Sequence, residues 1–525
     1  MATEPKIVSA SALVTTNPAT GEVLGELSCS TPDEVRASVL RAKAAQPQWQ
    51  ATPVRERIQI LRRFQQLLNQ RRDELARLIC REAGKPTAEA LVTEISVVLD
   101  TAEFCIRRAH NFLRPQPLPH RNPAMKTKRG KLVREPYGVI GIISPWNYPF
   151  SIPAIETLAA LITGNAVVLK PSEFTPLIGL EVERLLRAAG LHPDLMQVVM
   201  GEAPAGAALT ESPIDKLIFT GSVATGKRVG EAAARRLLPV VLELGGKDPM
   251  IVLDDANLEI ATSGALWGAF MNAGQTCLSV ERCYVHRSLY GPFLALCRDK
   301  IARLRVGNGL DSEVEIGPMI HGRQLQIVEA QVNDAVARGA RLLAGGKRLP
   351  ELGPNFYAPT LLADVTHNMR IMQEETFGPV LPVAPFDSDE EAVRLANDSD
   401  FGLAASVWTR NRRRGEAMAR KIKAGTVMLN DMISCFGIAE APHGGFKQSG
   451  IGRTHGELGL HEMVQVKYVD VDLVPGMPKV WWFGYGKKYQ PQLEGFIDLL
   501  FARRWAAKLR GALRAAGLPR RSNRI

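Results

Sequence analysis

Between residues 137 and 244, short apolar runs alternate with segments of helical pattern, and this alternation limits the folds open to the chain. The runs span residues 138–143, 166–169, 197–200, 216–219 and 240–242. Short apolar strands separated by helices are typical of a parallel sheet with helices on its faces. We therefore predict an α/β fold in which residues 1–117 and 137–244 form a Rossmann-type, dinucleotide-binding domain.

The 525-residue chain is too long for one hydrophobic core, so a second domain is expected. Strand-like and helix-like segments keep alternating beyond the first domain, for example at 283–285 and 292–304. This pattern predicts a second α/β domain over residues 245–446. Residues 118–136 and 461–470 are extended and mostly polar in pattern, and we assign them to a separate small β element.

The composition is that of an ordinary globular protein, with 46% apolar and 23% charged residues. No run reaches the roughly 18 apolar residues of a membrane-spanning helix, and the first 16 residues lack the apolar core of a secretory signal. The seven cysteines show neither a disulfide framework nor a paired CxxC. Asp254 and Asp255 fit no calcium loop, and Asp255 is predicted to cap a helix. We therefore expect reduced thiols, no metal and a cytoplasmic setting.

The net charge of +11 is concentrated in a C-terminal tail. Residues 476–525 contain 11 Lys and Arg against 2 Asp and Glu, which accounts for +9 and leaves +2 for the rest of the chain. An aromatic cluster at 481–485 precedes apolar residues at helical spacing from Leu493 to Ala516, with arginines on the other side. This pattern predicts a single amphipathic helix. It suits a peripheral membrane contact, while docking on the protein itself or on a second subunit explains it equally well. Nucleic acid is not expected, because the aromatics cluster instead of following a basic groove.

Three residues in separate motifs have the side chains that acyl-transfer chemistry requires. Cys277 follows a small-residue turn at 272–276, Glu243 follows a predicted strand, and Asn147 lies just beyond the carboxyl end of another. A thiol acts as a nucleophile once it is deprotonated, a carboxylate acts as a base, and an amide stabilises an oxyanion. The other six cysteines are better explained as small buried residues.

Further motifs accompany these three in a fixed order. They are Leu-Lys-Pro-Ser-Glu at 169–173, Phe-Thr-Gly-Ser at 219–222, Glu-Glu-Thr-Phe-Gly-Pro at 374–379 and Pro-His-Gly-Gly-Phe-Lys at 442–447. Together the motifs resemble the aldehyde dehydrogenase superfamily from about residue 17 to about residue 470. The resemblance is to the NAD(P)-dependent, hydrolytic members, in the branch related to diapolycopene-dialdehyde and succinate-semialdehyde dehydrogenases.

The resemblance implies a fold and a reaction. The fold would combine the Rossmann-type domain, a catalytic domain at 245–446 and a bridging β element that joins subunits into a homodimer or homotetramer. Cys277 would attack the aldehyde, Asn147 would stabilise the oxyanion, and Glu243 would activate water to release a carboxylic acid. Relatives that pass the acyl group to coenzyme A lack this glutamate as a rule, so hydrolysis is expected here.

The resemblance also implies a cofactor site. Its predicted residues are Trp146, Lys170, Ser172, Glu173, Gly221, Ser222, Glu375 and Phe377. The spacing GxxxxG from Gly221 is weak as a motif, and its value lies in the helix N-terminus that follows, where a pyrophosphate can bind. A carboxylate at Glu173 would repel a 2′-phosphate, which favours NAD, although relatives with a similar residue accept NADP as well.

The substrate is predicted to be an apolar or long-chain aldehyde. The proposed pocket residues are Tyr148, Ile152, Met271 and Phe436, all uncharged. His443 occupies the position of a phenylalanine in many relatives and is interpreted as a loop histidine. A semialdehyde substrate is the main alternative, and a non-catalytic binding protein on the same fold is another. The basic tail at 476–525 and an apolar pocket would together suit a membrane-associated substrate.

Overall fold

The computed structural model describes residues 12–122, 125–476, 479, 481–483, 486–487 and 489–516. The chain divides into two compact units, one built from residues up to 112 and 136–464, the other from 113–135 and 465 onward. The first unit contains two large sheets. The second contains a small sheet and two helices.

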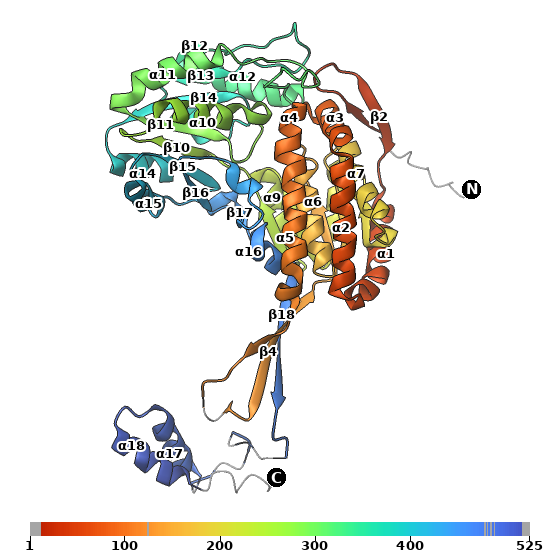
Figure 1. Cartoon of the computed structure of the whole chain (residues 1–525), viewed down its shortest axis with the longest axis vertical. Coiled ribbons are helices and arrows are strands. Elements are labelled where there is room, and N and C mark those ends of the chain that lie inside the picture. The colour runs from red at the N-terminus through yellow and green to blue at the C-terminus, as the bar shows by residue number, and fades with distance from the viewer. Residues whose placement is uncertain are drawn as a thin grey trace, which may run out of the picture. The chain divides into compact units, whose positions relative to one another are not determined.

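A six-stranded sheet organises the first half of the larger unit (Figure 1). Its order is β17 (Gly450–Ile451), β9 (Val240–Glu243), β8 (Lys216–Thr220), β5 (Val139–Ile143), β6 (Ala166–Lys170) and β7 (Met196–Val198). The strands from β9 to β7 are parallel, which confirms the predicted arrangement. β17 adds an antiparallel strand that the apolar pattern did not predict, because it is two residues long.

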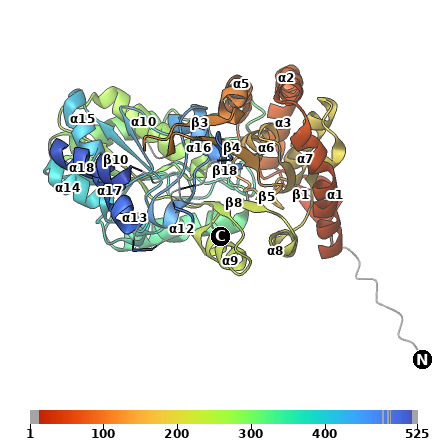
Figure 2. The ribbon, with the colours of Figure 1, turned by 90° about the horizontal axis from the view of Figure 1, so that it is seen from below.

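Helices cover both faces of this sheet. The helices are α1 (Pro32–Ala51), α2 (Val54–Gln70), α3 (Arg72–Ala83), α4 (Thr87–Ala90), α5 (Ser96–Leu113), α6 (Ser151–Ile162), α7 (Pro176–Ala188), α8 (Ala203–Glu211) and α9 (Val223–Ala234). A π-helical turn at Leu91–Ile95 joins α4 to α5. In the view of Figure 2, α5 and α6 lie on one side of β5 and β8, and α8 and α9 lie on the other. The apolar residues of the strands are consequently buried on both faces.

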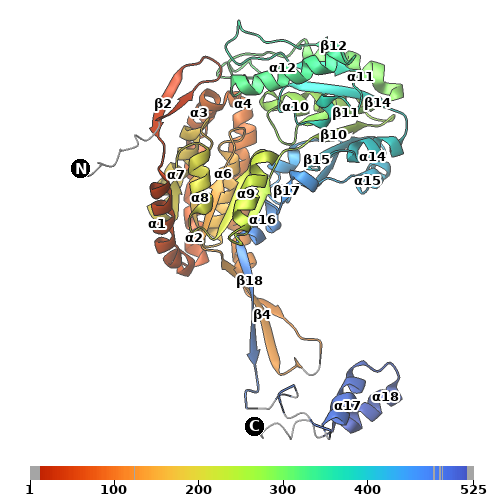
Figure 3. The same cartoon turned by 180° about the vertical axis from the view of Figure 1, so that it is seen from behind.

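The second sheet of this unit has seven strands (Figure 3). Its order is β12 (Arg341–Ala344), β13 (Thr360–Ala363), β14 (Val380–Phe386), β11 (Val280–His286), β10 (Asp248–Val252), β15 (Ala404–Trp408) and β16 (Thr426–Leu429). The accompanying helices are α10 (Leu258–Phe270), α11 (Arg287–Ile301), α12 (Gly322–Ala337), α13 (Arg370–Gln373), α14 (Asp389–Asn397) and α15 (Arg412–Ala419). α16 (Gly456–Glu462) instead contacts α6 of the first sheet. The strands are parallel except for β12 at the edge. An N-terminal hairpin, β1 (Ala12–Thr16) and β2 (Val23–Ser28), completes the unit.

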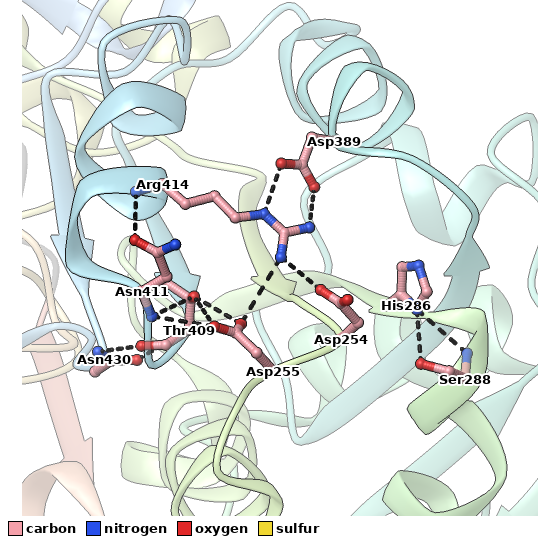
Figure 4. Close-up of polar contacts among 9 residues, drawn as sticks. All are labelled: Asp254, Asp255, His286, Ser288, Asp389, Thr409, Asn411, Arg414 and Asn430. Carbon is pink, nitrogen blue, oxygen red and sulfur yellow. Dashed lines mark hydrogen bonds and ion pairs between the residues drawn. The ribbon is translucent and has the colours of Figure 1, made fainter.

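A polar network at the end of β10 corrects one prediction. Asp255 does not cap a helix; Asn257 caps α10, and its side chain accepts from the amide of Ile260. Asp255 instead accepts from the Thr409 hydroxyl, at 2.7 Å, and from the Asn411 amide (Figure 4). Asp254 pairs with Arg414, which also binds Asp389. Across the described residues there is no group of His, Cys, Asp and Glu that could hold a metal.

The smaller unit contains a three-stranded sheet in the order β18 (Val464–Asp472), β4 (Lys128–Pro136) and β3 (Gln116–Leu118). The side chains of these strands are mostly exposed or half-buried, as their polar sequences predict. Polar strands with open edges are suited to pairing with a second chain.

The predicted single helix at 493–516 is wrong, because the chain folds back into a hairpin. α17 (Gln490–Phe501) and α18 (Trp505–Ala515) are separated by an extended break at Ala502. Gly495 and Gly511 let the two backbones approach closely: a Cβ built on Gly511 would lie 2.6 Å from the Gly495 carbonyl oxygen. Gly484 and Tyr485 of the predicted aromatic cluster lie outside the described residues. Among the described residues, no helix is both long enough and apolar enough to span a bilayer.

Candidate active site

Cys277 is presented by a strained turn that follows α10. Asn272 and Ala273 both have left-handed backbones, with φ of 54° and 53°. Such a conformation costs about 1–3 kcal/mol at a non-glycine residue and persists only where neighbours hold it. Here the Asn272 amide N–H donates to Glu89, at 3.0 Å, and its side chain donates to the carbonyl oxygens of Asn147 and Gln275. The turn is therefore fixed from three sides.

The thiol of Cys277 lies in an environment that opposes ionisation. Burial raises its pKa well above the usual value, and the nearby carboxyl groups of Asp248, Glu375 and Glu243 raise it further. A thiol in such a site reacts only when a base removes its proton. The site must therefore contain a proton acceptor.

Asn147 lies beside this turn, as predicted. Its side chain is buried, and its Nδ2 donates to the Gln275 carbonyl oxygen at 3.0 Å. An amide nitrogen has two hydrogens, so one such bond leaves a second donor. Asn147 and Cys277 line the same cavity.

Glu243 ends β9 and is buried. Within the described structure, neither of its side-chain oxygens has a hydrogen-bond partner. Burial raises the pKa of this carboxyl group well above the usual value, and Glu156 raises it further, while Arg453 lowers it. A buried carboxyl group without a hydrogen-bond partner, whose pKa is raised by burial, is suited to exchange protons with neighbouring groups.

A cavity of about 320 Å³ joins Glu243 and Cys277 to an apolar wall. All four predicted pocket residues, Tyr148, Ile152, Met271 and Phe436, line it. The Tyr148 hydroxyl also lies 2.9 Å from the hydroxyl of Thr276, the residue before Cys277.

Sequence reasoning missed several residues of this wall. These include Val92, Thr93, Val97, Glu156, Trp267, Ile433, His443 and His455. Glu156 had a detectable signal, because it is the one charged residue within the otherwise apolar segment 151–162. Its pKa is raised to about 8 by burial. Val92 and Trp267 had no such signal, since helices distant in the sequence bring them together.

A second cavity, of about 310 Å³, also reaches Cys277. Five of the predicted cofactor residues, Trp146, Gly221, Ser222, Glu375 and Phe377, line it. Trp146 and Phe377 pack edge to face, with centroids 5.4 Å apart. Glu375 accepts from the Gly246 amide at 3.0 Å, and burial raises its pKa to about 8. Its neighbour Glu374 is exposed and pairs with Arg370, so the two glutamates have different environments.

The residues of this second cavity fit a dinucleotide. Ser222 caps α9 by accepting from the Thr225 amide, so the N-terminus of a 12-residue helix opens at the cavity. Free amides and the helix dipole at such a position bind phosphate groups. Lys170, Ser172 and Glu173 do not line the described cavity. Lys170 ends the neighbouring strand β6, and its Nζ lies 3.2 Å from Glu173.

Comparison with known proteins gives matches along almost the whole chain. The aldehyde dehydrogenase family model matches residues 7–469. A 4,4'-diapolycopene aldehyde oxidase of Methylomonas sp is 39% identical over 490 residues, which cover 92% of this chain and 90% of that protein.

Solved structures agree. The NAD-dependent aldehyde dehydrogenase from Sinorhizobium meliloti superposes with a TM-score of 0.87 at 38% identity, covering 91% of this chain and 94% of that one. An NADP-dependent enzyme of E. coli superposes with a TM-score of 0.84 at 37% identity, covering 88% and 95%.

Proposed function

The chain belongs to the aldehyde dehydrogenase family, and from this premise we propose that it oxidises an apolar aldehyde to the carboxylic acid through Cys277, Glu243 and Asn147. The family match and the related solved structures identify the protein as an NAD(P)-dependent aldehyde dehydrogenase. The proposal is supported by two cavities that are both lined by Cys277. One has apolar walls and contains Glu243, and the other contains the predicted cofactor residues.

The reaction begins with removal of the Cys277 proton. The raised pKa of the thiol requires a base, and Glu243 lines both cavities with it. The thiolate then adds to the aldehyde carbon and produces a tetrahedral oxyanion. The second hydrogen of Asn147 Nδ2 and the Cys277 backbone N–H are the proposed donors to this oxyanion. Loss of one such donor typically lowers the rate by ~10²–10³.

A bound NAD(P) would supply the acceptor for the hydride that leaves the tetrahedral carbon. We propose that Trp146 and Phe377 would flank its reactive ring and that Glu375 would hold a ribose. Gly221 and Ser222, which line the same cavity at the start of α9, would receive the pyrophosphate. Lys170 and Glu173 are proposed to meet the adenosine ribose. Because Glu173 would repel a 2′-phosphate, NAD is the proposed preference.

The thioester left on Cys277 is then hydrolysed. Glu243 first releases the Cys277 proton to solvent and then takes a proton from water. The water oxygen bonds to the thioester carbon, the C–S bond breaks, and the carboxylic acid and the Cys277 thiolate are released. Glu243 and Cys277 line the same two cavities, so a water molecule held there can contact both groups.

The walls of the substrate cavity favour an apolar aldehyde over a semialdehyde. No Arg or Lys stands among the described residues that line it, whereas Glu156 and Glu243 both do. The carboxylate of a semialdehyde would lose its hydration in this cavity without gaining a compensating cation. The name of the Methylomonas relative, an aldehyde oxidase of diapolycopene, is consistent with a long apolar substrate.

A reduced-cofactor absorbance assay tests this function. It uses NAD and NADP without coenzyme A, on aldehydes from short to long chain together with one aromatic aldehyde and one semialdehyde. We expect turnover without coenzyme A and kcat/KM that rises with apolar length. A clear preference for the semialdehyde would contradict the apolar assignment, and absence of turnover on every aldehyde would favour a binding role.

The small sheet is proposed to join subunits into a homodimer or homotetramer. Val466, Tyr468 and Val471 of β18 are exposed in the single chain. Unpaired strands with exposed apolar side chains form intermolecular sheets readily. Light scattering on a size-exclusion column is expected to give two or four chains, and a monomer would contradict the proposal.

The helical hairpin of α17 and α18 is proposed to bind an anionic membrane surface. Large apolar side chains point outward along it, with Phe501 70%, Trp505 77% and Leu513 71% exposed. The segment 490–516 also has five basic residues, Arg503, Arg504, Lys508, Arg510 and Arg514, against two acidic ones. Exposed aromatic residues beside arginines are typical of an interfacial helix, and the excess positive charge complements anionic lipid.

Co-sedimentation with vesicles tests the hairpin proposal. We expect the full chain to bind phosphatidylserine-containing vesicles more strongly than phosphatidylcholine vesicles, and a chain ending at Pro475 to bind neither. The double variant F501S/W505S is the matched control, because it keeps the charge and removes the apolar contact. Equal sedimentation of the full and shortened chains would remove the idea, and a change in oligomeric state alone would assign the hairpin to subunit contact.

A further inference from the structure

Two histidines that the proposed reaction does not use lie in the wall of the substrate cavity beside Glu243. His443 and His455 are both buried, and both line the cavity with Cys277. Their ring centroids are 5.6 Å apart, and Phe436 packs against both, at 5.4 and 4.7 Å. The two imidazoles are therefore a fixed pair that faces the reacting groups.

His443 approaches the Glu243 carboxyl group. Its Nε2 lies 3.7 Å from Glu243 Oε2, which is longer than a direct hydrogen bond, so the bond forms only when the two groups move closer together. The backbone of His443 is held by two hydrogen bonds with Thr454, each of 2.8 Å. The imidazole is thus presented to Glu243 from a rigid segment.

His455 keeps a backbone conformation that other side chains avoid. Its φ is 59° and its ψ is 163°, a region populated almost exclusively by glycine. Its Nδ1 lies 3.0 Å from the Thr454 hydroxyl, and its Nε2 has no hydrogen-bond partner in the described structure. Such strain concentrates at functional sites, and here it places an imidazole behind His443.

The charged groups around Glu243 come from several elements. Glu156 on α6 and Glu462 on α16 raise the pKa of Glu243, and Arg453, which follows β17, lowers it. Burial lowers the pKa of His443 to about 4 and that of His455 to about 3. Both imidazoles are therefore neutral near pH 7. A neutral imidazole can donate one N–H to a carboxylate without adding charge.

We propose that His443, supported by His455, is a positioning residue that donates its Nε2–H to the ionised Glu243 carboxylate and so keeps this carboxylate available as the hydrolytic base. The proton taken from water goes to Glu243, and the imidazole stays neutral throughout. This inference rests on the proposed role of Glu243.

Hydrolysis of p-nitrophenyl butyrate isolates the step. Cys277 displaces nitrophenolate by forming the S–C bond of the thioester while the ester C–O bond breaks, and release of butyrate then requires the base. A donor that stabilises the ionised carboxylate lowers its pKa. The deacylation rate is measured as a function of pH, and its fall at low pH is the acid limb of the profile. His443→Phe is expected to move this acid limb to higher pH by about one unit. His443→Gln, which keeps an N–H donor, is expected to return the limb toward wild type.

The variant His455→Gly tests whether His455 acts on His443 or only stabilises the fold. Glycine adopts the observed φ and ψ without strain, so the unfolding midpoint should stay or rise, while the acid limb should move in the same direction as in His443→Phe. The inference would be overturned if His443→Phe left the acid limb at the wild-type pH. It would also be overturned if His443→Phe and His443→Gln gave the same acid limb. Glu243→Gln separates the proposed role of Glu243 from the proposed role of His443. If it deacylates at the wild-type rate, the base assignment itself is wrong; if it is slow while His443→Phe keeps the wild-type limb, only the role of His443 is wrong.

Discussion

Replacing Lys85 with methionine is expected to destabilise the protein strongly, because Lys85 belongs to a fully buried ion pair. Its Nζ lies 2.6 Å from Glu94 Oε1, and both side chains are 0% exposed. The other oxygen of Glu94 accepts from the amides of Phe150 and Ser151. Lys85 also lies 3.7 Å from the centre of the Tyr148 ring. Loss of one partner of such a pair leaves an uncompensated buried charge.

The expected magnitude is about 3–5 kcal/mol, the cost typical of breaking a buried ion pair by removing one partner. Loss of Lys85 should also weaken the strained turn at Asn272 and Ala273. Lys85 lowers the pKa of Glu89, which burial raises to about 7, and Glu89 accepts from the Asn272 amide. Without Lys85, Glu89 is protonated over more of the neutral pH range, and its bond to the strained turn weakens.

Urea unfolding followed by tryptophan fluorescence measures the effect, with catalytic rate measured on the folded fraction. Lys85→Met/Glu94→Met removes both charges together and is the matched control. It should recover part of the loss, since no charge is left unpaired. A free energy of unfolding within about 1 kcal/mol of wild type for Lys85→Met would refute the reasoning.

Three further predictions concern the proposed chemistry. Cys277→Ala should abolish aldehyde oxidation and keep cofactor binding measured by calorimetry; retained oxidation would reassign the nucleophile. Asn147→Ala should lower kcat by ~10²–10³ in steady-state assays, and a loss below tenfold would remove Asn147 as an oxyanion donor. Glu156→Gln should lower the pKa of Glu243, because Glu156 raises it. The activity that needs ionised Glu243 should then persist to lower pH, and a pH–rate profile with the acid limb unmoved would contradict this coupling.

The fold could be predicted from the sequence where local patterns are strong. The strands β5, β6 and β8 are short apolar runs buried on both faces, and such runs are visible without any tertiary information. Their carboxyl ends mark where ligands bind in parallel sheets. This explains why Asn147, Glu243 and Ser222 could be proposed as candidate site residues from the sequence.

The parts that escaped prediction depend on contacts between distant segments. The His443–Glu243 approach joins residues 200 positions apart, and neither sequence neighbourhood marks it. The hairpin was predicted as one helix because α17 and α18 keep the same apolar spacing, and only the mutual approach of Gly495 and Gly511 reveals the fold-back. Helical periodicity records which side is apolar but does not record where a helix breaks.

The proposed reaction requires that a thioester forms on Cys277 and that Glu243 activates the water that hydrolyses it. The most direct measurement is intact-protein and peptide mass spectrometry of Glu243→Gln, quenched in acid after mixing with cofactor and a medium-chain aldehyde. The account predicts one acyl group per chain, on the peptide that contains Cys277, together with one equivalent of reduced cofactor. Sustained turnover without an acylated peptide, or an acyl group on any of the other six cysteines, would contradict it.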